Sequence, residues 1–297
     1  MTESRSAGTR CVLICGAGLL FCCGLLHVPT AVLAHRGVHE ALTALDQAIE
    51  RDPENARLYL RRGDLHRVHR DWAAALTDYE RARGLDPQLT TVDFCIGRML
   101  FEASWMKPAL VALDRFLELE PGHLQGRVYR ARVLAKLGLN REATVDYTRV
   151  ISASGASRKP RPEYYLERAR TVVAQGDEHI GPALRGIDEG LERLGSVVTL
   201  QLYAIELERK RKHYNKALRR VESIADTATR KESWLARRGD ILAAAGRIGE
   251  ARLSYTAALA ALNALHPQRR TTRAMLRLRA RLEERLAPET QTGGEKR

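Results

Sequence analysis

The chain has 297 residues, a length that fits one or two domains. Aromatic residues make up only 5%, while Ala, Leu and Arg are abundant, which favours helices and argues against a sheet-based fold. The formal net charge of +13 predicts an acidic partner, a membrane surface or nucleic acid, unless it reflects only an arginine-rich solvated surface.

Residues 1–34 have the features of a secretory signal peptide. Arg5 and Arg10 precede an apolar, uncharged run from Cys11 to Leu26, and small side chains lead up to Ala34. The run is short for a membrane span, which takes about 20 apolar residues. We expect cleavage, with an uncleaved anchor through residues 11–34 as the alternative. The protein would then be exported and extracytoplasmic (periplasmic), or tethered to the membrane by its N-terminus.

A repeat of 34 residues follows this segment. Three prolines and three alanines recur at that spacing: Pro53, Pro87 and Pro121, with Ala41, Ala75 and Ala109. Between successive prolines lie two stretches with helical apolar spacing, such as residues 56–68 and 72–85. A fixed period of this size predicts a solenoid of stacked helix pairs.

These features resemble the tetratricopeptide repeat, a 34-residue helix–turn–helix unit. The resemblance implies an all-α, right-handed superhelical solenoid closed by a C-terminal capping helix. The residues that carry the repeat pattern are Gly63, Ala75, Tyr79, Ala82, Pro87, Gly97, Ala109, Pro121, Ala131, Ala143, Gly239, Ala251, Tyr255 and Ala258.

The pattern divides the chain as follows. A solenoid covers 35–286 and begins with a half repeat at 35–53. Three clear repeats follow at 56–155, and a Ser/Gly/Pro-rich loop at 156–161 separates them from three more at 162–263, of which two are degenerate. We expect a capping helix at 267–286 and a disordered tail at 287–297.

The tetrapeptide RRGD occurs twice, at 61–64 and 237–240. Its glycines share one slot of the repeat with other small residues, namely Gly97, Ala131, Ala169 and Ala204. Glycine lowers helix stability by about 1 kcal/mol relative to alanine, so its recurrence inside a helix indicates close packing of two helices. We therefore interpret RRGD as part of the repeat and not as an exposed adhesion loop.

In this family, ligands usually lie in a concave groove lined by the first helices of the repeats. The residue after the small-residue slot is Asp64, Arg98, Arg132, Arg170, Ile205 or Asp240. Arginines in three successive repeats predict an anionic ligand, such as an acidic peptide or a C-terminal carboxylate, because Arg forks match carboxylates. The alternative is internal neutralisation by Glu102, Glu163 and Glu167. The predicted peptide groove comprises Arg61, Phe94, Arg98, Phe101, Tyr129, Arg132 and Arg170.

The sequence contains no nucleophile elbow, P-loop, zinc pattern or dinucleotide fingerprint. We therefore expect no catalytic residues, no metal, no cofactor and no small-molecule substrate. The predicted function is a non-catalytic scaffold or adaptor that binds a protein or peptide partner. A regulatory subunit of an envelope enzyme is one alternative. Binding of a polyanion or nucleic acid through the basic surface is another, although the few aromatics argue against stacking on single strands.

Overall fold

The computed structural model describes residues 30–153 and 159–287. The chain separates into two compact units, Met1–Pro53 and Glu54–Arg297. In the first unit, helix α1 (Thr30–Arg51) runs through the predicted cleavage point at Ala34 and the predicted half repeat. The rest of the predicted signal segment, together with the predicted tail from residue 288 on, lies outside the described residues.

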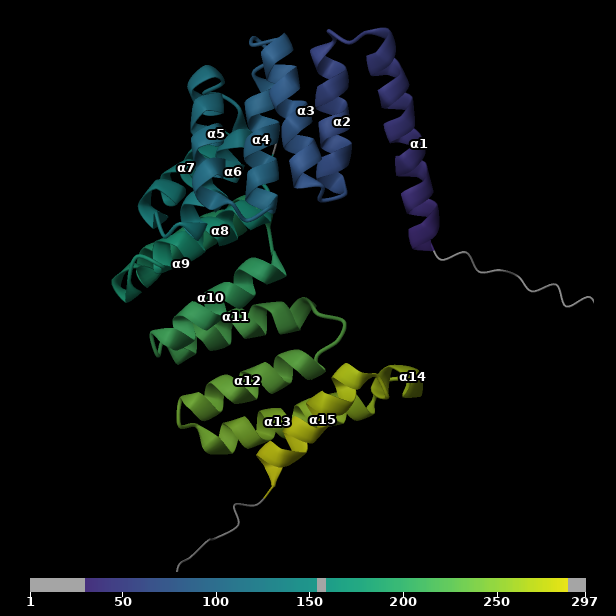
Figure 1. Cartoon of the computed structure of the whole chain (residues 1–297). Helices are drawn as coiled ribbons and strands as arrows, with labels where there is room; N and C mark the ends of the chain where they lie inside the picture. Colours follow the sequence, from purple (N-terminus) through teal and green to yellow (C-terminus); the bar gives the residue numbers. More distant parts are fainter. Residues whose placement is uncertain (1–29, 154–158, 288–297) are drawn as a thin grey trace, which may run out of the picture. The chain divides into compact units, whose positions relative to one another are not determined.

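The described part of the second unit is built from helices that pack in consecutive pairs (Figure 1). The first helices of the pairs are α2 (Ala56–Val68), α4 (Thr91–Glu102), α6 (Leu124–Lys136), α8 (Pro162–Val173), α10 (Val198–Lys210) and α12 (Glu232–Ala244). Their partners are α3 (Trp72–Leu85), α5 (Met106–Leu119), α7 (Asn140–Ala153), α9 (Ile180–Leu194), α11 (Tyr214–Thr227) and α13 (Ile248–Asn263). Each pair also packs against the next, so the predicted all-helical solenoid of helix pairs is confirmed.

In five of the six pairs, the turn between the two helices contains one residue with left-handed backbone. Gly138 and Gly246 hold this position with φ of 79° and 75°, a conformation that glycine adopts without steric cost. Arg70, Ser104 and Lys212 hold it in other pairs with φ between 58° and 65°. Left-handed backbone costs a residue with a Cβ about 1–2 kcal/mol, so packing of the two helices holds these turns in place.

Two segments depart from regular pairs. The residues around 177–179 form a short 3₁₀ helix, η1 (Asp177–His179), which accommodates part of the extra length of the fourth repeat. The predicted capping helix at 267–286 is interrupted, because α14 (Pro267–Arg270) and α15 (Arg273–Leu286) are separate. Thr271 follows the last residue of α14, and Thr272 has extended backbone (φ −62°, ψ 146°), which breaks the helix before α15 begins.

The small-residue slot is a close contact between the helices of a pair. A Cβ added to Gly63 would lie 2.7 Å from Cε1 of Tyr79, and one added to Gly239 would lie 2.4 Å from Cε1 of Tyr255. Gly97 faces Leu113 in the same way. Both RRGD sequences therefore lie within helices, α2 and α12, with their glycines buried.

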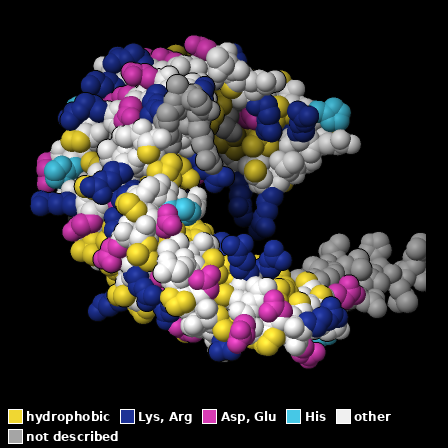
Figure 2. All heavy atoms as spheres, turned by 90° about the horizontal axis from the view of Figure 1, so that it is seen from above, with side chains coloured by type: hydrophobic (Ala, Val, Ile, Leu, Met, Phe, Trp, Pro, Cys, Tyr) yellow, Lys and Arg dark blue, Asp and Glu magenta, His cyan; other side chains and the backbone are white. Residues whose placement is uncertain are grey.

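In the part of the chain that the structure describes, no helix is long and apolar enough to span a bilayer. Figure 2 shows acidic side chains interspersed among the basic ones over the visible face. On this face, positive and negative side chains therefore alternate, and the positive charge does not form one continuous patch.

Candidate binding face on the first helices

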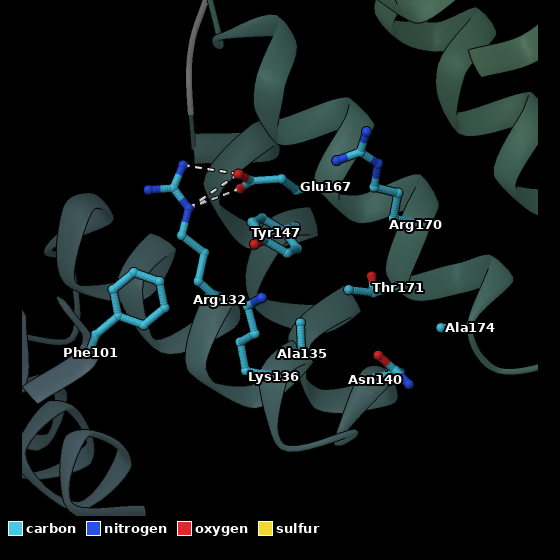
Figure 3. A pocket seen from close by; sticks show the side chains of 10 residues that line it. All are labelled: Phe101, Arg132, Ala135, Lys136, Asn140, Tyr147, Glu167, Arg170, Thr171 and Ala174. Atoms are coloured by element: carbon cyan, nitrogen blue, oxygen red, sulfur yellow. Dashed lines mark hydrogen bonds and ion pairs between the residues drawn. The ribbon is translucent and has the colours of Figure 1, made fainter. Parts of the chain in front are cut away.

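A pocket of about 530 Å³ opens on the first helices of three successive pairs (Figure 3). Helices α4, α6 and α8 contribute most of its lining, and α7 adds two residues. The lining comprises Phe101, Arg132, Ala135, Lys136, Asn140, Tyr147, Glu167, Arg170, Thr171 and Ala174. Three residues of the predicted groove, Phe101, Arg132 and Arg170, therefore line one cavity.

Arg132 and Glu167 form an ion pair at this pocket. Nε of Arg132 lies 3.2 Å from both carboxylate oxygens of Glu167, and one terminal nitrogen lies 3.0 Å from Oε1 (Figure 3). Burial acts to lower the pKa of Arg132, but the hydrogen bonds and charge of Glu167 outweigh it and raise that pKa. Burial, and then Glu167, raise the pKa of the Tyr147 hydroxyl, which stays neutral. Arg132 is thus neutralised within the chain.

Arg98 is neutralised by the preceding repeat. Its guanidinium lies 2.5 Å from Oδ1 of Asp64, which also accepts the hydroxyl of Tyr79 at 2.9 Å. Arg67 donates to Asp64 at 3.3 Å and to Glu102 at 2.6 Å. These residues join two adjacent first helices, α2 and α4, in one charged network.

Arg170 differs from the other two arginines. It is exposed on α8, and its guanidinium lies 5.7 Å from the ring centroid of Tyr203 on α10. Among residues 30–153 and 159–287, no acidic side chain pairs with it. Arg170 therefore keeps an accessible charge at the pocket, and a cation stacked on an aromatic ring retains free N–H donors.

The predicted aromatic residues form one cluster beside the pocket. The ring centroid of Tyr129 lies 5.7 Å from that of Phe94 and 5.7 Å from that of Phe101, and both contacts are edge-on. Arg98 lies over Phe94 at 5.5 Å, and Arg132 lies over Tyr129 at 5.9 Å. The cluster gives the face an apolar, half-buried surface next to the charged pocket.

Two parts of the groove prediction need correction. Ile205, which follows the small-residue slot in α10, is fully buried, so that position does not face an open groove in every repeat. Of the glutamates expected to neutralise the arginines, Glu167 pairs with Arg132, as the alternative proposed. Glu102 pairs instead with Arg67, and the carboxylate that neutralises Arg98 is Asp64. Arg61, exposed on α2, does not line the pocket.

A second set of arginines was missed in the sequence. Arg62, Arg130 and Arg238 immediately precede the small-residue slot, and each bonds a residue 16 positions later, on the second helix of its pair. The partners are Asp78 (2.9 Å), Asp146 (2.8 Å) and Ser254 (2.6 Å), all buried. The recurring 16-residue offset was readable in the sequence and could have identified them.

The described residues contain no group of three or more His, Cys, Asp or Glu side chains placed to hold a metal ion. The pocket combines two accessible cations, Arg170 and Lys136, with a neutral tyrosine, an ion pair and aromatic edges. Such a surface can bind and orient an extended chain through hydrogen bonds and apolar contacts.

The stacked helix pairs form an α-helical repeat solenoid, and its first helices carry the pocket. A tetratricopeptide repeat model matches residues 30–89, and a tetratricopeptide repeat-like domain model matches residues 185–280. The chain belongs to the tetratricopeptide repeat family, whose fold indicates a scaffold for protein–protein interaction.

Solved structures show the same fold at low sequence identity. A tetratricopeptide repeat protein from Parabacteroides merdae is 15% identical, with a TM-score of 0.53 over 84% of this chain and 95% of its own. YrrB is 19% identical, with a TM-score of 0.51 over 62% and 91%. The pilF protein of Pseudomonas aeruginosa is 16% identical, with a TM-score of 0.51 over 70% and 93%. No curated protein matches the sequence significantly.

Proposed function

We propose that the protein is a non-catalytic scaffold that holds a peptide segment of a partner protein on its first-helix face. The observation that carries the proposal is Arg170, an exposed arginine without an acidic partner among the described residues, in a pocket of about 530 Å³. A carboxylate of the peptide binds this guanidinium, because Arg–carboxylate hydrogen bonds are charge-assisted and bidentate. YrrB, which has a similar fold, is described as having an unusual peptide-binding site.

The pairing at Arg98 and Arg132 narrows this proposal. A groove with three free arginines would select a run of acidic residues. With Arg98 held by Asp64 and Arg132 held by Glu167, the unpaired cations among the described residues that line the pocket are Arg170 and Lys136, next to the Phe94, Phe101 and Tyr129 cluster. The ligand that fits is therefore a segment with one or two carboxylates flanked by apolar side chains, such as a C-terminal carboxylate, an Asp or a Glu.

Selection from a random peptide library tests this proposal. Selected peptides should carry a carboxylate next to apolar residues, and Arg170→Gln should weaken their binding about ten-fold or more, because a hydrogen bond to a charged group contributes about 1.5–3 kcal/mol. Fluorescence anisotropy measures the dissociation constants. Arg141→Gln, an exposed arginine on α7 outside the pocket lining, is the control with the same charge change. Unchanged affinity in Arg170→Gln would refute the anchor.

We also propose that the protein is exported, on the basis of the charged start, apolar run and small residues of segment 1–34. N-terminal sequencing of the protein recovered from cells checks this. A mature chain that begins near residue 35 shows cleavage, and an intact N-terminus in the membrane fraction shows an anchor. An intact chain in the cytoplasmic fraction contradicts export.

A further inference from the structure

A second pocket, of about 610 Å³, lies near the C-terminal end of the solenoid, away from the peptide pocket on α4, α6 and α8. It is bounded by α10, α12 and α15. Four arginines line it: Arg209 from α10, Arg237 from α12, and Arg277 and Arg281 from α15. The last two are four residues apart and share a face of their helix. We refer to these four residues as the arginine pocket.

None of the four arginines has an ion-pair partner in the stretches that the structure describes. Neighbouring arginines on the same helices do: Arg238 bonds Glu222 and Ser254, and Arg279 bonds Asn263 and lies 3.8 Å from Glu283. Arg238 and Arg279, which lie outside the pocket lining, are therefore paired, whereas the described residues offer no ion pair to the four arginines that line it.

The carboxylates at the pocket do not balance its positive charge. Asp240 lines the pocket, and its Oδ1 accepts the hydroxyl of Tyr255 at 3.0 Å. Glu206 is the other acidic group that acts on Arg237. Burial is the main cause that lowers the pKa of Arg237, and the charges of Arg209 and Arg281 lower it further. Four arginines thus line the pocket together with one carboxylate, Asp240, over a floor that includes the buried Leu278.

We propose that the arginine pocket binds a phosphate group. Guanidinium groups reach it from three helices, so a matching ligand needs acceptor oxygens that point in several directions. A phosphate monoester offers three such oxygens and nearly two negative charges, whereas a carboxylate offers two oxygens in one plane and one charge. Like-charged arginines over an apolar floor repel one another in the empty pocket, and a bound dianion relieves that repulsion. This site is independent of the proposed peptide function.

The phosphate has two sources, a small phosphorylated molecule or a phosphorylated side chain, and both present the same group. Isothermal titration calorimetry on the full chain at constant ionic strength distinguishes them, with inorganic phosphate, phosphoserine and a phosphoserine peptide as probes. Succinate, a dicarboxylate of the same charge, is the control for charge alone. We expect both small phosphates to bind at least ten-fold more tightly than succinate. A further gain with the peptide identifies a phosphorylated side chain as the source.

Variants locate the binding. Arg277→Gln/Arg281→Gln removes two exposed guanidinium groups and should weaken phosphate binding about ten-fold or more, because hydrogen bonds to charged groups are lost. Arg237→Gln should have a similar effect. Arg279→Gln, on the same helix but outside the pocket, should leave the affinity unchanged. Equal binding of succinate and phosphate, no detectable phosphate binding, or full affinity in the double variant would each overturn the proposal.

Discussion

Replacing Asp146 by alanine is expected to lower the free energy of unfolding by about 3–5 kcal/mol, the effect of breaking a buried ion pair on one side. Asp146 is 1% exposed and accepts hydrogen bonds from Arg127 at 3.1 Å and from Arg130 at 2.8 Å. Arg127 is itself buried, so its charge would be left without a counter-ion inside the solenoid. The hydrogen bond that Arg130 donates to Asp146 is also the main cause of the raised pKa of Arg130. Urea denaturation followed by circular dichroism measures the loss.

Asp114→Ala is the matched control for this prediction. Asp114 also pairs with Arg130, at 3.0 Å, but its side chain is 46% exposed. An exposed pair contributes about 0–1 kcal/mol, so this variant should lose no more than that. Comparable losses in the two variants would contradict the view that burial makes the Asp146 network important.

Replacing Tyr79 by alanine is expected to destabilise the second unit by about 3–5 kcal/mol, as other large-to-small changes at buried aromatic positions do. Tyr79 is fully buried and packs on the backbone of Gly63, where a Cβ would lie only 2.7 Å from the ring. Alanine would leave a cavity between α2 and α3 that Gly63 has no side chain to fill. Thermal and urea unfolding both measure this change.

Tyr79→Phe separates the packing of the ring from the role of the hydroxyl. The hydroxyl donates to Asp64 at 2.9 Å, and a single such bond contributes about 1 kcal/mol, or somewhat more with a charged acceptor. The phenylalanine variant should therefore keep most of the stability. If it loses as much as the alanine variant, the hydrogen bond, and not the contact with Gly63, accounts for the doubled RRGD sequence.

The features that the sequence predicted well depend on local steric rules. The 34-residue spacing of Pro53, Pro87 and Pro121 follows from the length of one helix pair, and each small-residue slot follows from one contact within a pair. Both rules act within a single repeat, so one chain is enough to read them. The interruption at residues 271–272 was not predicted, because it lies at the extended backbone of Thr272 and residues 268–273 contain no Gly or Pro to mark it.

The charged contacts were harder to predict, because they depend on the stacking of repeats. Asp64 and Arg98 occupy the same position in consecutive repeats, 34 residues apart, and stacking brings them to 2.5 Å. Arg132 and Glu167 are joined across the boundary between the third and fourth repeats, from positions that are not equivalent. Considered within its own repeat alone, each of Arg98 and Arg132 was interpreted as an unpaired cation. Comparison with the same position one repeat earlier would have identified Asp64 as the partner of Arg98.

Arg170 is the exception that gives the face its proposed role. The next repeat offers Ile205 at the corresponding position, which is buried and cannot pair with a guanidinium. Among the residues that follow the small-residue slot, the degenerate repeats at 162–229 therefore leave Arg170 uncompensated. The irregularity that weakened the repeat pattern in the sequence is the same feature that creates the proposed anchor.

Site-specific photo-crosslinking tests the central claim most directly. A photoreactive amino acid at Ala174, which lines the peptide pocket, should form a covalent adduct with a defined partner protein in cells that produce this chain. The same group at Thr148, exposed on the second helix α7, should form none, and Arg170→Gln should reduce the adduct at Ala174. Equal adducts from both positions, or an adduct from Thr148 alone, would contradict binding on the first-helix face.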